Sequence, residues 1–306
     1  MTENLSTVDT VKIPAPSFLS GELWPDTGSA RVRVELAAQS HQGLVRANNE
    51  DHYLVMRFGR ALETMLTNLP ADQFPARAEE VGYGLVVADG MGGTSAGEVA
   101  SSMAIRTLLS LVLHTPDWIL GTSEREAERT MERMRERLRS ISAALLDQGL
   151  GDPSLSGMGT TMTLTYSLGA SLVIGHVGDS RAYLFRDGGL HQLTRDHTLV
   201  QSLVDIGCLT AEKAAVHPFR HRLTRFLGGR GDPLPADIQR AWLSDQDQLL
   251  LCTDGLTEMV DRTTIGSVLE NVATAEEACQ TLVALALKNG GRDNVTVALA
   301  RYRFPP

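Results

Sequence analysis

The stretch Gly82-Tyr-Gly-Leu-Val-Val-Ala-Asp-Gly-Met-Gly-Gly-Thr-Ser-Ala-Gly-Glu98 decides how this chain folds. Its apolar run, Leu85–Ala88, predicts a buried strand that leads into Asp89-Gly90 and a glycine-rich turn. An Asp-Gly pair often forms a two-residue hairpin, but a second alternating strand would then have to follow. Ser95-x-x-Glu98 follows instead, and this capping-box pattern before apolar residues at helical spacing predicts a helix. Asp89 is therefore expected between a buried strand and a helix, where its carboxylate can bind a hard cation.

Composition limits the classes of protein that the chain can belong to. Its 306 residues are 42% hydrophobic, which is enough for a full core in two domains or in one large α/β domain. The net charge of −9 argues against a nucleic-acid binder. Three cysteines without CxxC spacing indicate a reducing compartment rather than a disulfide framework or a zinc site. Since no run of about 18 apolar residues and no signal-peptide pattern occurs, we expect a cytoplasmic protein without a membrane span.

Hydrophobic periodicity predicts an α+β chain. The predicted strands cover residues 31–38, 53–56, 85–88, 160–167, 171–177, 182–185, 248–252 and 295–301. The predicted helices cover residues 96–113, 196–206, 210–215, 262–271, 275–289 and the stretch from the capping box Ser123-x-x-Glu126 to Gly149. Asp187-Gly188 is predicted to be a hairpin turn, because strand-like residues flank it. Strands come in runs rather than in alternation with helices, which favours a layered fold with antiparallel sheets.

Three regions interrupt this pattern. Residues 1–30 contain three prolines and no sustained period, which predicts a poorly ordered N-terminal tail. Residues 59–80 have mixed polarity and predict an insertion without a clear element. Residues 196–230 combine short helical pieces with a basic run that contains Arg220, His221 and Arg222.

Four aspartates share a context that suggests one site. Asp89 and Asp254 each follow an apolar strand and precede a glycine and a helix, whereas Asp51 and Asp293 stand just before strands. Carboxylates at strand ends can converge on one sheet edge, where they raise one another's pKa unless cations neutralise them. Oxygen ligands without a Cys or His cluster favour Mg²⁺ or Mn²⁺, and two such ions can activate a water and hold a phosphoryl oxygen. Arg46, in the same loop as Asp51, can clamp the phosphate; four independent turn or cap aspartates are the alternative.

Six motifs together make the chain recognisable, although each alone is weak. They are Arg46-x-x-x-Glu50-Asp51, Val86-Val-Ala-Asp-Gly-Met-Gly-Gly93, Gly159-Thr-Thr161, His176-Val-Gly-Asp-Ser-Arg181, Cys252-Thr-Asp-Gly-Leu256 and Gly291-Arg-Asp-Asn-Val295. In this order they resemble the metal-dependent protein serine/threonine phosphatases, the PPM or type 2C family, in its bacterial branch. The resemblance covers residues 33–302.

The resemblance implies a four-layer αββα sandwich, in which helices flank two antiparallel sheets and a metal site lies at one end. Residues 31–303 would form a single catalytic domain, with 59–80 as an insertion and 196–230 as a mobile flap beside the site. The implied reaction is hydrolysis of phosphoserine and phosphothreonine in proteins, by a water that two Mn²⁺ or Mg²⁺ ions activate, without a phosphoenzyme.

The resemblance also assigns roles to individual residues. Asp89 would bridge both ions and the Gly90 carbonyl would be a ligand. Asp254 and Asp293 would hold one ion, and Arg46 would bind the substrate phosphate. Arg46, Asp89 and Asp254 would therefore carry catalysis.

Further ligands and two departures follow from the same resemblance. Asp51 would be linked to the second ion, directly or through water, with Glu50 as a further candidate. Asp179 would help to hold a third, weaker ion. Met91 stands where some members carry a histidine proposed as the general acid, so the leaving-group proton must come from elsewhere. Thr94 stands where bacterial members often have histidine.

Two other functions remain open at this point. A catalytically silent PPM-fold protein would bind or regulate a partner, but the presence of every metal-site aspartate argues against it. Gly93-x-Ser95-x-Gly97 matches the nucleophile elbow of serine hydrolases, but Ser95 lies seven residues beyond the strand end at Ala88.

The other reactive side chains have mainly structural interpretations. His176 is expected in a sheet, while His197 and His217 in the 196–230 segment can be either proton donors or structural residues. Cys252 is expected to pack within its strand. As partners we expect phosphorylated proteins, among them a serine/threonine kinase and its targets, in a signalling role, with the chain itself a monomer.

Overall fold

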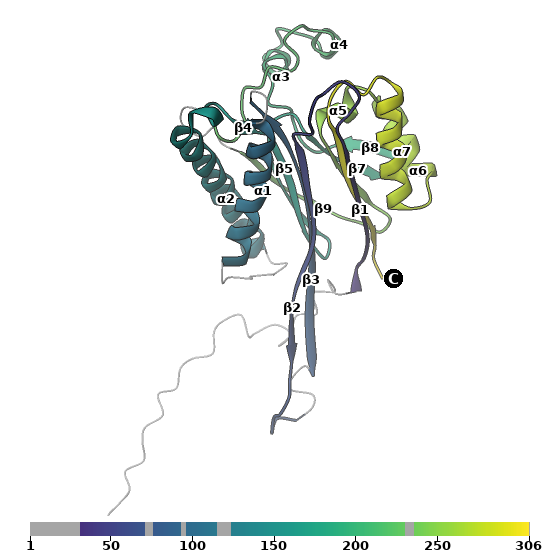
Figure 1. Cartoon of the computed structure of the whole chain (residues 1–306). Helices are drawn as coiled ribbons and strands as arrows, with labels where there is room; N and C mark the ends of the chain where they lie inside the picture. The colour runs from purple at the N-terminus through teal and green to yellow at the C-terminus, as the bar shows by residue number, and fades with distance from the viewer. Residues whose placement is uncertain (1–30, 71–75, 93–95, 115–123, 230–235, 306) are drawn as a thin grey trace, which may run out of the picture. The chain divides into compact units, whose positions relative to one another are not determined.

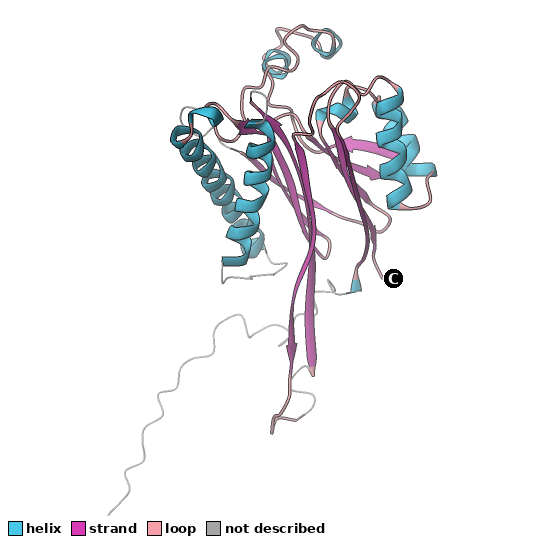
Figure 2. Cartoon of the chain, in the orientation of Figure 1, coloured by secondary structure: helices cyan, strands magenta, loops and turns pink. Residues whose placement is uncertain are grey.

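The computed structural model describes residues 31–70, 76–92, 96–114, 124–229 and 236–305. The predicted tail 1–30 and the predicted capping serines Ser95 and Ser123 lie outside these residues. Two antiparallel sheets lie face to face, and helices cover their outer faces (Figures 1 and 2). This arrangement is the four-layer αββα sandwich that the sequence predicts.

The first sheet has the strand order β1-β11-β10-β7-β8. Its strands are β1 (Arg33–His41), β11 (Val295–Arg303), β10 (Gln248–Cys252), β7 (Arg181–Arg186) and β8 (Gly189–Gln192). Asp187 and Gly188, with φ of 51° and 73°, form the turn between β7 and β8. Positive φ at both central residues is the requirement of a type I′ turn, so the predicted hairpin is confirmed.

The second sheet has the strand order β2-β3-β5-β6-β9, and β4 pairs with the end of β3. Its strands are β2 (Asp51–Glu63), β3 (Arg77–Met91), β4 (Gly159–Thr160), β5 (Met162–Leu168), β6 (Ser171–Val177) and β9 (Asp237–Trp242). In β3, Leu85 and Val87 face the space between the sheets, whereas Val86 and Ala88 face helices. The apolar run of the deciding stretch therefore reflects a strand that is buried on both faces.

Two long helices cover the second sheet. They are α1 (Ala96–His114) and α2 (Glu124–Gly151), and a short 3₁₀ helix, η3 (Pro153–Leu155), follows. Alanines of α1 and leucines of both helices pack against Val86, Met162 and Val173 of the sheet. By length and composition α1 would also suit a membrane span, but core helices of soluble proteins meet the same criteria. Its buried residues Ala100 and Ala104 belong to the core described here.

The first sheet is covered by α6 (Arg262–Asn271) and α7 (Ala275–Lys288). Asp261 and Thr274 cap these helices, because their side chains accept the N–H groups of Thr264 and Glu277. Three shorter helices complete the chain: α3 (Leu199–Asp205), α4 (Ala211–Ala215) and α5 (Asp254–Thr257). α3 and α4 belong to the flap segment, residues 196–230, of which the structure describes 196–229.

The structure corrects the prediction of an element-free insertion at residues 59–80. β2 continues from the predicted short strand to Glu63, and β3 begins at Arg77. Arg60 and Glu80 form an ion pair of 2.5 Å. The outer parts of β2 and β3 are polar, so they lack the apolar pattern from which a strand is predicted. These parts form strands because each pairs with a neighbouring strand. β9 was missed for the same reason, since its residues alternate between exposed and half-buried positions.

Contacts divide the chain into a large unit, 27–61 with 79–306, and a small unit, 1–26 with 62–78. The large unit contains every helix and strand described above except the outer ends of β2 and β3. Within the small unit, Thr64 N–H donates to the Ala76 carbonyl at 3.0 Å. The division into an N-terminal tail and one catalytic domain remains a prediction.

Candidate metal centre

Five aspartates from distant parts of the chain gather at one end of the two sheets. Asp89 lies near the end of β3, Asp51 begins β2, Asp254 begins α5 after β10, Asp293 precedes β11, and Asp179 lies between β6 and β7. Burial raises the pKa of Asp89 well above its usual value, and the charges of the other four aspartates raise it further. The expected convergence of these carboxylates is therefore observed.

Asp51 is a deeply buried carboxylate of this cluster. Its side chain is 4% exposed, and burial together with Asp254 and Asp293 raises its pKa to about 7. Thr253 Oγ1 donates to one carboxylate oxygen at 2.8 Å. The other oxygen of Asp51 and one buried oxygen of Asp254 have no hydrogen-bond partner among the described residues. Buried polar atoms are rarely left in this state, because removing them from water without a partner costs free energy.

The donor set fits a hard divalent cation. It consists of carboxylate oxygens, and the Gly90 carbonyl follows Asp89 directly in the chain. Mg²⁺ and Mn²⁺ prefer such oxygen ligands, and their charge would neutralise the repulsion within the cluster. The partnerless oxygens of Asp51 and Asp254 are therefore suitable ligand atoms.

Arg46 lies at the rim of the centre. Its guanidinium forms an ion pair with Asp293, and its side chain is 53% exposed. The hydrogen bond to Asp293, with the charges of Asp293, Asp89 and Glu50, raises the pKa of Arg46. A positive group that is half exposed beside the carboxylates is placed to meet an anion from solvent.

Close backbone packing holds β2, β3 and α1 together beneath the centre. Gly90 N–H donates to the Glu50 carbonyl at 3.1 Å. A Cβ on Gly90 would lie 2.0 Å from the Gly97 carbonyl oxygen, and one on Gly97 would lie 2.7 Å from Glu50 Cδ. Gly90 therefore requires glycine, because the clash there is with backbone, and the carboxylate of Glu50 packs against Gly97 in the first turn of α1.

Asp179 occupies a tight turn. It is 9% exposed, and burial with the charges of Asp254 and Asp196 raises its pKa well above the usual value. Gly178, with φ of 117°, precedes it, and a Cβ there would lie 2.5 Å from Thr161 Cβ. Thr161 Oγ1 accepts the Asp89 N–H at 3.0 Å, so this turn and the end of β3 are held by the same residue.

Comparison with known proteins identifies the family. A family model described as protein phosphatase 2C matches residues 68–289. The chain belongs to the protein phosphatase 2C family. The predicted family resemblance is thereby confirmed.

Curated relatives of this family are bacterial. The serine/threonine protein phosphatase PstP of Mycobacterium tuberculosis is 39% identical over 273 residues, 89% of this chain and 46% of that protein. The chain thus spans about half the length of this relative. The serine/threonine phosphatase stp of Listeria monocytogenes is 37% identical over 215 residues, 70% of this chain and 82% of that protein.

Solved structures of the protein phosphatase 2C family confirm the fold. The serine/threonine phosphatase of S. agalactiae has a TM-score of 0.72 and 31% identity, covering 88% of this chain and 99% of that one. The PstP catalytic domain in complex with two manganese ions has a TM-score of 0.69 and 34% identity, covering 89% and 99%.

Sequence analysis missed the role of Asn294 in this 2C-family site. The side chain is 5% exposed, and its Oδ1 accepts the Glu50 N–H at 2.8 Å. Its Nδ2 donates to the carbonyls of Gln42 and Asn48, both at 2.8 Å. Asn294 thereby fixes the loop that carries Arg46 beside Asp293. Its position directly after a candidate ligand was the available signal.

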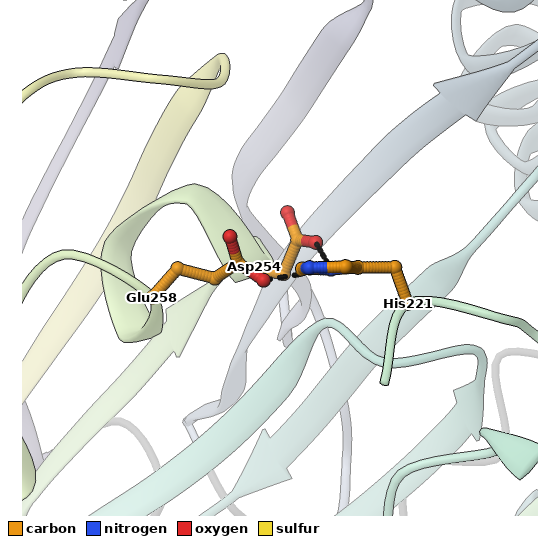
Figure 3. Close-up of side chains that lie close together, drawn as sticks. All are labelled: His221, Asp254 and Glu258. Atoms are coloured by element: carbon orange, nitrogen blue, oxygen red, sulfur yellow. Dashed lines mark ion pairs between the residues drawn. The ribbon is translucent and has the colours of Figure 1, made fainter. Parts of the chain in front are cut away.

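Two further neighbours of Asp254 were missed. His221, from the flap segment, has its Nδ1 2.7 Å from Glu258 Oε1 and 3.9 Å from Asp254 Oδ2 (Figure 3). The carboxylates of Asp254 and Glu258 raise the pKa of His221. The three side chains can also hold a metal ion by their spacing. Glu258 lies four residues after Asp254, one helical turn away, which was the signal in the sequence.

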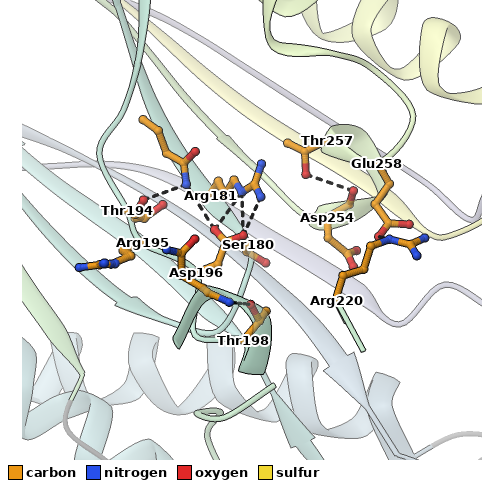
Figure 4. A network of polar contacts seen from close by, with 12 residues as sticks. Ser180, Arg181, Thr194, Arg195, Asp196, Thr198, Arg220, Asp254, Thr257 and Glu258 are labelled. Atoms are coloured by element: carbon orange, nitrogen blue, oxygen red, sulfur yellow. Dashed lines mark hydrogen bonds and ion pairs between the residues drawn. The ribbon is translucent and has the colours of Figure 1, made fainter. Parts of the chain in front are cut away.

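A bidentate ion pair holds the start of the flap segment. Arg181 of β7 donates from Nε and Nη2 to Asp196, at 2.9 and 2.6 Å, beside Ser180 (Figure 4).

Burial lowers the pKa of His176 to about 3, so this histidine is a neutral sheet residue, as expected. Cys252 is fully buried in the core, which confirms its packing within the strand, and this burial raises the pKa of its thiol to about 12. Ser95 lies outside the described residues.

Proposed function

We propose that this protein hydrolyses phosphoserine and phosphothreonine in other proteins with the help of divalent metal ions. One observation carries the proposal: carboxylates from five chain segments converge beside a half-exposed arginine, and two buried oxygens among them have no hydrogen-bond partner in the part of the chain that the structure describes. Membership of the protein phosphatase 2C family and relatives named as serine/threonine phosphatases support it.

Asp51, Asp89, the Gly90 carbonyl, Asp254 and Asp293 would hold two ions. Glu50 is a further candidate ligand, and Asp179 would hold a third, weaker ion. Such ions supply an activated water for attack on phosphorus and neutralise charge on the phosphoryl oxygens. Manganese is the first choice because the PstP catalytic domain binds two manganese ions, and magnesium suits the same oxygen donors.

Arg46 would bind and orient the phosphate. Its planar guanidinium can donate two parallel hydrogen bonds to phosphate oxygens. The aspartates alone would repel a phosphate dianion, so Arg46 provides the attraction that this chain itself can offer at the rim. Met91 has no proton to give, so the leaving group must be protonated by another donor. The buried Cys252 thiol is no nucleophile, which agrees with a reaction without a phosphoenzyme.

The cellular setting belongs to the same proposal. Three free cysteines, two of them buried, suit the reducing cytoplasm, and we expect a monomer there. There the protein would act in signalling, on the targets of a serine/threonine kinase or on the kinase itself. We expect no nucleic-acid or membrane partner.

The test is removal and return of metal. EDTA-treated protein should not release phosphate from a phosphothreonine peptide, and Mn²⁺ should restore release. Full activity after EDTA treatment would contradict the proposed mechanism. A catalytically silent relative, the alternative function, would bind Mn²⁺ but release no phosphate from the peptide or from p-nitrophenyl phosphate.

A further inference from the structure

His197 is a buried histidine with hydrogen-bond partners at both ring nitrogens and at both backbone groups. It is the second residue of the flap segment, and its side chain is 6% exposed. His197 has no role in the reaction proposed above. Yet each ring nitrogen and both of its backbone groups have partners in segments that lead to the metal centre or to the end of the flap segment.

The first side of the ring faces the turn that carries Asp179. Gly178 N–H donates to His197 Nδ1 at 3.1 Å, and His197 N–H donates to the Gly178 carbonyl at 2.7 Å. Gly178 directly precedes Asp179, and its φ of 117° and its contact with Thr161 leave the turn no room for a side chain. His197 therefore holds both backbone groups of the residue before a candidate metal ligand.

The second side of the ring faces Asp237 of β9 and Arg225, which lies near the end of the flap segment. Nε2 donates to Asp237 Oδ2 at 3.0 Å, and Arg225 donates to Asp237 Oδ1, also at 3.0 Å. Thr224 N–H donates to the His197 carbonyl at 2.8 Å. Arg225 Nη1 also lies 3.4 Å from Nε2. Because the Gly178 N–H needs Nδ1 as its acceptor and the nearer Asp237 carboxylate needs Nε2 as its donor, these two partners select the neutral tautomer with its proton on Nε2. His197 thus links the start of the flap segment to its last part, through its backbone carbonyl to Thr224 and through Asp237 of β9 to Arg225.

A buried chain of contacts continues from His197 to Asp89. The ring of His176 lies 4.7 Å from that of His197, and its Nδ1 lies 2.8 Å from Thr163 Oγ1. Thr163 Oγ1 donates to the Ser180 carbonyl at 3.0 Å. Ser180 Oγ lies 2.9 Å from Thr161 Oγ1, the atom that accepts the Asp89 N–H. Every member between His197 and Asp89 is buried, and hydrogen bonds within a buried network strengthen one another.

We propose that His197 is a positioning residue that fixes the Gly178–Asp179 turn and the base of the flap segment relative to the metal centre. The inference rests on the proposed function, since it takes Asp179 to be a metal ligand. Partners beyond the ligands typically contribute about 10- to 100-fold to metal affinity. A purely structural histidine would affect thermal stability without any selective effect on metal binding.

Two variants separate the two sides of the ring. In His197→Asn, the amide oxygen can take the place of Nδ1 and accept the Gly178 N–H, while the bond to Asp237 is lost. In His197→Gln, the amide nitrogen can take the place of Nε2 and donate to Asp237, while the bond to Gly178 is lost. Ser167→Ala is the matched control, because it removes a buried hydrogen bond of 2.9 Å to Tyr302 at the other end of β5.

The measurement is calorimetric titration of EDTA-treated protein with Mn²⁺, together with the rate of proteolysis in the flap segment and the melting temperature. We expect His197→Gln to weaken the weakest Mn²⁺ site about tenfold. His197→Asn should leave Mn²⁺ affinity near that of the wild type and speed proteolysis. Ser167→Ala should lower the melting temperature alone. Thr163→Val, which keeps the side-chain shape, gives a second test and should also weaken Mn²⁺ binding.

Other outcomes have distinct meanings. Wild-type Mn²⁺ affinity in both His197→Gln and Thr163→Val would overturn the positioning role, as would an equal loss of affinity in Ser167→Ala. A wild-type protein that binds Mn²⁺ but releases no phosphate would contradict only the proposed function. A wild-type protein that binds no Mn²⁺ would overturn both proposals.

Discussion

Asp247 and Asp254 flank the same strand, β10, and their carboxylates differ in how many hydrogen bonds the protein donates to them. Asp247 is 1% exposed, and its two oxygens accept hydrogen bonds from Arg186 at 2.8 and 2.5 Å and from Ser244 N–H at 2.7 Å. Asp254, at the other end, keeps a buried oxygen without a partner among the described residues. The oxygens of Asp247 are all hydrogen-bonded by the protein, whereas the proposed metal ligand Asp254 keeps one oxygen that can bind a ligand.

The arginines repeat this contrast. Arg186 is held by Asp247 and by the Trp242 carbonyl, to which it donates at 2.7 Å. Arg46 pairs with Asp293 and has a larger exposed fraction, 53% against 33% for Arg186. The candidate metal end of the sheet therefore differs from the opposite end in how fully its charged side chains are hydrogen-bonded by the protein, rather than in charge or burial alone.

The largest expected effect is on turnover. Asp254→Asn should lower kcat on a phosphothreonine peptide about 100-fold or more. The substitution removes a negative charge that would hold the metal ions, and these ions would stabilise the negative charge that develops on the phosphoryl oxygens in the transition state. Asp247→Asn should keep kcat within about threefold of the wild type, since that site is already saturated. Similar losses in both variants would break the comparison.

Stability should show the reverse order. Asp247→Asn should lower the free energy of unfolding by about 2 kcal/mol, because it weakens a buried ion pair whose arginine is one third exposed. In EDTA, Asp254→Asn should raise the melting temperature, since it removes a carboxylate from a cluster of like charges. Urea unfolding and thermal scans measure both, and a loss of stability for Asp254→Asn in EDTA would contradict the interpretation.

The two arginines should separate binding from stability. Arg46→Ala should raise KM for a phosphopeptide about tenfold with little change in melting temperature, because one charge-assisted hydrogen bond to phosphate is lost. Arg186→Ala should lower the melting temperature and leave KM unchanged. An unchanged KM in Arg46→Ala would remove Arg46 from the phosphate site.

The smallest expected effect is the pH dependence of the metal-free protein. The pKa of Asp51 is raised to about 7 from the usual 3.8, so the folded state binds a proton more tightly than the unfolded state. This contribution to stability is present in full below the unfolded pKa and is lost as pH rises through about 7. In EDTA the melting temperature should therefore fall as the pH rises from about 5 to about 8, a range that includes the raised pKa of Asp51. The increase caused by Mn²⁺ should be largest at the higher pH; a flat profile in EDTA would contradict the raised pKa.

Local patterns predicted the elements that pack against the core. The β10 boundaries, the α6 boundaries and the hairpin at Asp187-Gly188 were all predicted from periodicity and turn residues. The extensions of β2 and β3 were not, because polar strands are stabilised by a neighbour that the local sequence does not reveal. The convergence of the aspartates was predicted from their repeated position at strand ends.

The sequence by itself determined which residues can be buried, where the helices and strands that pack against the core lie, and which carboxylates stand at strand ends. Only the tertiary structure decided which polar groups meet: Thr253 with Asp51, Asn294 with Glu50, and His197 with both Gly178 and Asp237. The first two pairs are separated by 202 and 244 residues. Hydrogen bonds over such separations leave no periodic trace in the chain, because they depend on the folded path of the backbone and not on neighbouring residues.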